Sequence, residues 1–422
     1  MKKLFSICMM VALYSATFAQ DGAFSITASP AENTRNGMNI SWATGTGTTY
    51  AMVAVTSVKD SDWKKSTVKT LNGEYCATYD NQYSKKPDGK NFYEDVKINK
   101  YNAHITGLKR NTMYKYRVIT ESDTSSVHYF RTSGKNWEAC IISDFHAYAP
   151  LYHRTKSAME MISTVEKYGQ PIDWVLHLGD ITAWGGCYSF WQNLYTEKPF
   201  HNYMWAGVNG NHDNMTRTNK GNTNKFFRDA AAYPLNGYEG ELGVCYFFKY
   251  GDVLFIMLNN ENMRSEEGLQ KAQEWVKKVV AENPARYKVV CEHYQWFFGA
   301  SGRDSQYPRW SKLFDELGIT LALAGNNHIY ASTHPLYDGK VVDPGKGTVY
   351  IQTTSSDNER GSACDLEKPL EHNGEKIKFR WTEGGPTISA MHMKVTRKKM
   401  VLTLLDRNGK VLETTEVFPI KK

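Results

Sequence analysis

Short apolar segments alternate with amphipathic helical segments between residues 137 and 335, and this alternation constrains the fold more than any other feature of the chain. The helical pattern is clearest over residues 266–281, where Leu269, Val276 and Val279 recur on one face. Strands that alternate with helices are typical of an α/β domain in which helices cover the faces of a sheet. The apolar segments that we interpret as strands are 137–143, 174–178, 204–208, 288–292 and 319–324.

Polar residues follow each of these five predicted strands, and together they indicate a metal site. The carboxyl ends of the strands are the edge at which an α/β sheet binds its ligands. Imidazole, carboxylate and amide groups, with no cysteine among them, suit ions such as Mn, Fe or Zn. Turns also favour polar residues, so each motif alone is weak and the ordered series carries the prediction. The series is Asp144, His146, Asp180, Asn211, His212, Asp213, His293, Asn326 and His328.

Residues 22–133 have a different pattern, in which short alternating segments are separated by turn residues. A loop ending in Thr112 leads into a predicted strand with Tyr114 and Tyr116 on one face, as in the tyrosine corner of sandwich domains. This region resembles a fibronectin type III-like module. We interpret residues 80–100, which are rich in Lys, Asp, Asn and Tyr, as a loop insertion between its strands.

The β pattern returns after residue 347, with alternating segments between residues 388 and 418. We therefore predict two domains, an all-β sandwich over residues 22–133 and an α/β domain over residues 137–422 that includes these C-terminal strands.

The first nineteen residues have the three-part order of a secretory signal peptide. Lys2 and Lys3 form a basic start, residues 4–14 an apolar core, and a small-residue cleavage site ends at Ala19. The apolar core is too short to span a bilayer, and no later segment is apolar enough to do so. We therefore expect an exported protein, periplasmic or extracellular, without a transmembrane segment.

The charge of the chain argues against a nucleic-acid-binding protein. Its formal net charge is +7, but no basic run is concentrated, whereas nucleic-acid binding requires a clustered basic face. Removal of the signal peptide would leave six of the seven cysteines. Neither their pairing nor the oligomeric state follows from the sequence.

The ordered series of motifs resembles that of the calcineurin-like metallophosphoesterase superfamily. With a β-rich module in front of it, the arrangement is similar to that of the purple acid phosphatases. The resemblance implies a two-sheet β-sandwich flanked by helices and a site for two metal ions. The motifs that carry it are Asp144-x-His146, Gly179-Asp180, Gly210-Asn211-His212-Asp213, His293 and Gly325-Asn326-x-His328.

The resemblance also implies a role for each residue. His212 would stabilise the transferring phosphoryl group or protonate the leaving oxygen, and Asp213 would orient His212. Two ions, of Mn, Fe, Zn or Mg, would polarise a phosphoryl oxygen and activate a shared water for in-line attack as a bridging hydroxide. The implied ligands are Asp144, His146 and His328 for a first ion, Asn211 and His293 for a second, and Asp180 as the bridge between them.

Two positions depart from the pattern of the purple enzymes. Ala183 stands where those enzymes place the tyrosine that colours their iron, so the resemblance implies no tyrosinate–iron colour here. Asn326 stands where the family usually has a histidine ligand of the second ion. An amide oxygen can bind a hard ion such as Mn or Mg, but it is a poorer zinc ligand than imidazole. The second site is therefore expected to be weaker, to select a different ion, or to be partly empty.

These features favour an exported metal-dependent phosphoesterase that acts on small-molecule or macromolecular phosphate esters, with monoesters first. A phosphodiesterase of the same family is one alternative. A second is a non-catalytic binding or adhesion protein with a degenerate metal site, for which Asn326 is the motive.

Overall fold

The structure of the chain is a computed structural model. The predicted signal peptide, residues 1–19, lies outside the described residues. Among the described residues, no helix is long and apolar enough to cross a membrane. The described residues are 22–71, 74–80, 95–148, 152–169, 171–215, 224–298, 305–356, 371–372, 375–376, 379–383 and 388–420.

The larger of the two main sheets has ten strands in the order β25-β24-β23-β9-β10-β11-β1-β2-β6-β5. Its central strands β9, β10 and β11 are parallel, so their carboxyl ends lie at one edge. The strands are β1 (Phe24–Pro30), β2 (Met38–Gly45), β5 (Glu74–Asp80), β6 (Asp95–Ile105), β9 (Trp137–Ile142), β10 (Trp174–His177), β11 (Met204–Gly207), β23 (Ser389–Val395), β24 (Met400–Asp406) and β25 (Val411–Val417).

The second main sheet has seven strands in the order β12-β13-β14-β15-β19-β16-β22. Strands β13, β14, β15 and β19 are parallel neighbours. The strands are β12 (Tyr246–Tyr250), β13 (Val253–Met257), β14 (Tyr287–Cys291), β15 (Leu321–Ala324), β16 (Tyr330–Thr333), β19 (Val349–Gln352) and β22 (Phe379–Glu383).

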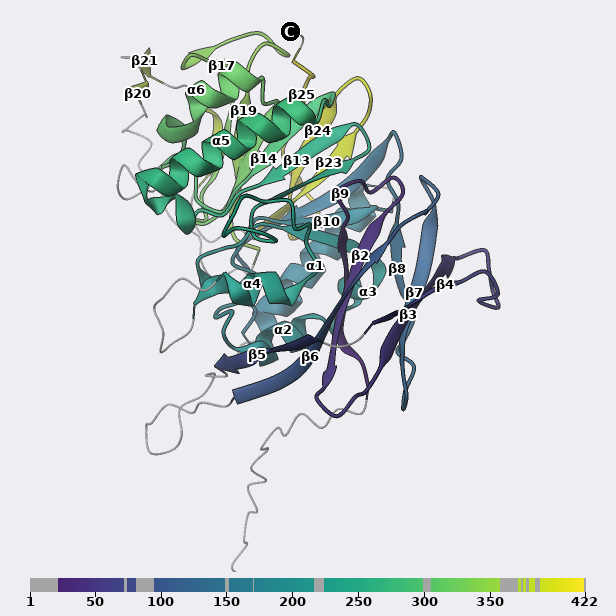
Figure 1. Cartoon of the computed structure of the whole chain (residues 1–422). Helices are drawn as coiled ribbons and strands as arrows, with labels where there is room; N and C mark the ends of the chain where they lie inside the picture. Colours follow the sequence, from purple (N-terminus) through teal and green to yellow (C-terminus); the bar gives the residue numbers. More distant parts are fainter. Residues whose placement is uncertain are drawn as a thin grey trace, which may run out of the picture.

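The two main sheets pack face to face, and helices cover their outer faces. Trp174 of β10 and Phe255 of β13 meet between the sheets, with ring centroids 5.2 Å apart. Side chains alternate along a strand, so Leu254 and Ile256 of β13 face outward and pack under helices α5 (Glu266–Glu282) and α6 (Tyr307–Leu317) (Figure 1). Helix α1 (His153–Tyr168) lies against β9 and β23. This confirms the predicted layered α/β domain.

The N-terminal region is β-rich, as predicted, and forms a sandwich. A four-stranded sheet of β4 (Thr67–Leu71), β3 (Ala51–Ser57), β7 (Met113–Thr120) and β8 (His128–Arg131) packs against β2 and β6 through one shared core. The Tyr114 hydroxyl accepts a 2.8 Å hydrogen bond from the backbone N–H of Lys109, which is the contact expected of a tyrosine corner.

Two features of this region were not predicted. Strand β1 pairs in parallel with β11, at Ala28 and Met204, so the ten-stranded sheet runs through both predicted domains. The loop assignment for residues 80–100 is wrong for residue 80, which ends β5, and for residues 95–100, which belong to β6. Residues 98–100 pair with β2, for example Lys100 with Ala43, and residues 95 and 96 pair with β5; these partners outweigh the polar composition. Residues 81–94 lie outside the described residues.

Candidate metal centre

The five strands that the sequence singled out carry the candidate site at their carboxyl ends. Asp144 and His146 follow β9, Asp180 follows β10, and Asn211 and His212 follow β11. In the facing sheet, His293 follows β14, and Asn326 and His328 follow β15. Because each sheet brings parallel strands to the same edge, residues far apart in the sequence meet at one place.

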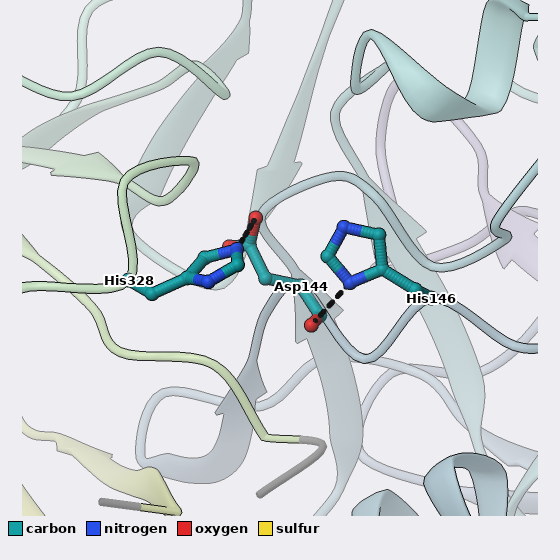
Figure 2. A group of neighbouring side chains, drawn as sticks. All are labelled: Asp144, His146 and His328. Carbon is teal, nitrogen blue, oxygen red and sulfur yellow. Dashed lines mark hydrogen bonds and ion pairs between the residues drawn. The ribbon is translucent and has the colours of Figure 1, made fainter. Parts of the chain in front are cut away.

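The first group of side chains consists of Asp144, His146 and His328. Each offers one ligand atom, and these atoms lie within 4.8 Å of one another. Figure 2 shows the two imidazole rings on opposite sides of Asp144. His328 Nε2 lies 3.4 Å from Asp144 Oδ1, and all three residues are buried. This is the set expected for a first metal ion.

Asp180 lies between the first group and a second one. Its Oδ2 is 3.3 Å from His146 Nε2, and its Oδ1 is 3.3 Å from His293 Nε2. The Asn211 side-chain oxygen is 3.2 Å from the same nitrogen of His293. One carboxylate therefore faces both groups, an arrangement that suits a bridging ligand.

Backbone carbonyls orient three of the imidazole rings. His146 Nδ1 donates to the Asp144 carbonyl and His293 Nδ1 donates to the Leu178 carbonyl, both at 2.7 Å. His212 Nδ1 donates to the Ala183 carbonyl at 2.8 Å. In each ring the backbone carbonyl fixes a proton on Nδ1, so Nε2 is the nitrogen that would coordinate a metal ion or react.

The site is strongly polarised because opposite charges are buried together. Burial would raise the pKa of Asp180, but the charges of His293 and His212 hold it well below its ordinary value. Burial would likewise raise the pKa of Asp144, but His328 and His293 outweigh it, so that pKa is lowered. For His293 burial acts to lower the pKa, and the Asp180 carboxylate outweighs it, raising the pKa to about 10.

The residues present fit a bound metal ion. Asp144 Oδ1 is buried, and the one described contact that could compensate its charge is the long one to His328 Nε2, at 3.4 Å. A buried carboxylate oxygen left in this way costs free energy unless a positive charge completes its surroundings. The carboxylate oxygens and imidazole nitrogens that converge here are the donors that Mn, Fe and Zn accept.

Backbone strain is concentrated in the same residues. Ten non-glycine residues of the described chain have positive φ, and half of them belong to the site. At Gly179, φ is +93° and an added Cβ would lie 2.3 Å from His293 Nδ1, so no other residue fits. Such strain persists only where the surrounding structure fixes it, and it clusters at functional sites. The strained site residues are Asp144 (54°), His146 (45°), Asp180 (49°), Asn326 (72°) and His328 (60°).

Asp213 has a different position from the one expected. Its Oδ1 accepts from the backbone N–H and the hydroxyl of Thr182, both at 2.9 Å, and its Oδ2 accepts from Gly210 N–H at 3.1 Å. The expectation that Asp213 orients the His212 ring is therefore corrected, because the Ala183 carbonyl holds that ring. Asp213 instead fixes the two turns that carry Asp180 and His212. Burial and the charge of Asp180 raise the pKa of Asp213 to about 7.

Sequence reasoning missed one residue that contacts the site. Gln295 is 3% exposed and accepts a hydrogen bond from the Asn326 side chain. Its position two residues after His293 was the only signal in the sequence.

Comparison with known proteins agrees with this geometry. Residues 139–330 match the calcineurin-like phosphoesterase family, and residues 23–132 match the purple acid phosphatase N-terminal domain. No curated protein matches the chain.

Solved structures share the fold at low sequence identity. The purple acid phosphatase PPD1 from seeds of yellow lupin (Lupinus luteus) is 14% identical with a TM-score of 0.69, over 94% of this chain and 74% of that one. PhoD is 13% identical with a TM-score of 0.59, over 93% of this chain and 92% of that one. The chain therefore carries a calcineurin-like phosphoesterase domain behind a purple acid phosphatase N-terminal domain, and these two domains support a hydrolase that acts on phosphate esters.

Proposed function

We propose that the chain is an exported phosphatase that hydrolyses phosphate monoesters with two metal ions bound at the strand ends. The observation that supports this best is the position of Asp180, whose two oxygens face His146 on one side and His293 on the other. Asp144, His146, His328 and Asp180 would hold the first ion, and Asp180, Asn211 and His293 the second.

The bound ions would supply Lewis acidity toward the phosphoryl group and a water nucleophile at neutral pH. The protein residues would orient the ester and manage the leaving group. His212 adjoins this centre, because its backbone N–H donates to Asp180 Oδ1 at 2.8 Å. Its Nδ1–H donates a hydrogen bond to the Ala183 carbonyl, so Nε2 is the atom that would carry the proton for the leaving oxygen.

The activity is tested with the chain from Gln20 onward, stripped of metal and reloaded separately with Mn, Fe, Zn and Mg. We expect metal-dependent hydrolysis of p-nitrophenyl phosphate, with a lower kcat/KM for bis(p-nitrophenyl) phosphate. A higher value for the diester would replace the monoester assignment by a phosphodiesterase. No turnover on either ester with any of the four metals would refute the proposed function.

Export is proposed from the first nineteen residues alone. It predicts that the full chain, expressed in a bacterium, is recovered from the periplasm or medium with Gln20 as its first residue, as read by mass spectrometry. Recovery with an intact N-terminus would contradict it.

One observation supports the alternative of a non-catalytic protein: Asn326 stands where the family usually has a histidine ligand. It predicts at most one bound ion and no dependence of function on Asp180 or His212. Counting the metal ions bound to the purified chain distinguishes a two-ion phosphatase from a non-catalytic protein that binds at most one.

A further inference from the structure

Asn326 lies where two loops are bonded to each other beside the candidate site. Gly325 N–H donates to the His293 carbonyl at 2.9 Å, and Asn326 N–H donates to Asp144 Oδ2 at 3.1 Å. The first bond ties the Asn326 loop to the strand end that carries His293. The second ties it to a carboxylate of the first group. The backbone that carries Asn326 is thus bonded to a residue of each candidate ligand group.

The amide nitrogen of Asn326 has a partner outside the site. Its Nδ2 donates to Gln295 Oε1 at 2.5 Å. Gln295 is buried at 3% exposure, and its backbone carbonyl accepts from Gln306 N–H at 3.0 Å, so its own position is fixed. No described residue donates to the amide oxygen of Asn326.

The chemistry of an amide determines which end of the Asn326 side chain can bind a cation. A carboxamide can bind a cation only through its oxygen, since its nitrogen is a donor without a free lone pair. Because the Asn326 nitrogen donates its hydrogen bond to Gln295, the Asn326 oxygen is the atom that can bind a cation. An unconstrained amide could turn its NH₂ group toward the site and repel a cation.

We propose that Gln295 is a positioning residue that keeps the oxygen of Asn326 available to the second metal ion. The second position would then be built from oxygens of Asp180, Asn211 and Asn326 with one imidazole, that of His293. The first position has two imidazoles. Because hard ions prefer oxygen ligands, the second position would favour Mn or Mg relative to Zn more than the first position does. This inference rests on the two-ion site of the proposed function.

The test measures Mn²⁺ binding to the metal-free chain by titration calorimetry and by electron paramagnetic resonance, without any substrate. Gln295→Met removes the acceptor at similar volume. We expect it to raise the Kd of the weaker Mn²⁺ site by roughly 10- to 100-fold, as loss of a ligand-orienting partner does, and to leave the tighter site unchanged. Gln295→Glu retains an oxygen acceptor and is expected to bind at least as tightly as the native chain.

The matched control is Gln306→Met, the same exchange at a buried glutamine next to Gln295 whose side chain pairs with Arg309. It should bind both ions as the native chain does. In an Asn326→Ala background, Gln295→Met should cause no further loss, because the residue it positions is gone.

Three results would overturn the inference: unchanged binding in Gln295→Met, an added loss in the Asn326→Ala background, or a native chain that binds a single Mn²⁺. A chain that binds two Mn²⁺ ions with the expected response to Gln295→Met, yet hydrolyses no phosphate ester, would refute the proposed function and support this inference.

Discussion

Replacing His128 should make the fold markedly more resistant to acid. His128 lies on β8, and its ring contacts that of His201 on helix α3 (Lys198–Asn202), with centroids 4.2 Å apart. Its Nδ1 is buried without a hydrogen-bond partner among the described residues. Burial, followed by the charge of His201, lowers the pKa of His128 to about 3.

The size of the effect follows from linkage between protonation and folding. A histidine whose folded pKa is depressed contributes stability that is present above the unfolded pKa of about 6.5 and is lost as the pH falls. At pH 4 the unfolded chain carries this proton and the folded chain largely does not. The assay pH of 4 lies about 2.5 units below the unfolded pKa of about 6.5. At 1.36 kcal/mol per unit, the free energy of unfolding falls by about 3 kcal/mol because of this one histidine.

The assay is urea unfolding of the metal-free chain at pH 7 and pH 4, for the native chain and for His128→Phe, which keeps a ring in the core and cannot titrate. The native chain should lose about 3 kcal/mol more between the two pH values than the variant does. His334→Phe, at an exposed position, serves as the control. An equal pH dependence of the native chain and His128→Phe would refute the reasoning.

The remaining predictions concern the site. Asp180→Asn should lower kcat more than 100-fold and release at least one ion, as measured by metal analysis. The control is Asp173→Asn, at the other end of β10, which should retain both ions. Equal ion loss in the two variants would contradict the bridging role of Asp180. His212→Gln should lower kcat by roughly 10²–10⁴ while ion content is unchanged, and ion loss would instead make it a ligand. Gly179→Ala should lower the melting temperature and both metal affinities, because its Cβ would collide with the His293 ring; unchanged affinities would show that the ring can shift.

The strands, and the convergence of candidate ligands at their ends, could be predicted because both rest on local patterns. Each ligand directly follows an apolar segment, so knowing that Asp180 and His293 sit at strand ends was enough to expect them to meet. The contacts that orient these side chains could not be predicted from local sequence patterns. The partner of His212 is the backbone carbonyl of Ala183, and no side-chain pattern identifies a carbonyl.

Long-range pairing was equally hidden from the sequence. Nothing in the composition of residues 95–100 distinguishes a strand from a loop until β2 and β5 are placed beside them. The same holds for Gln295, which is an ordinary buried amide until Asn326 is brought next to it from the facing loop.

The pairing of β1 with β11 has a consequence for how the chain can be divided. A fragment that began after residue 133 would leave β11, whose residues are all buried, as the open edge of a sheet. An unpaired, apolar edge strand is a template for pairing with other chains. The phosphoesterase domain of this protein is therefore expected to aggregate when made alone, because the N-terminal domain covers the edge of its sheet.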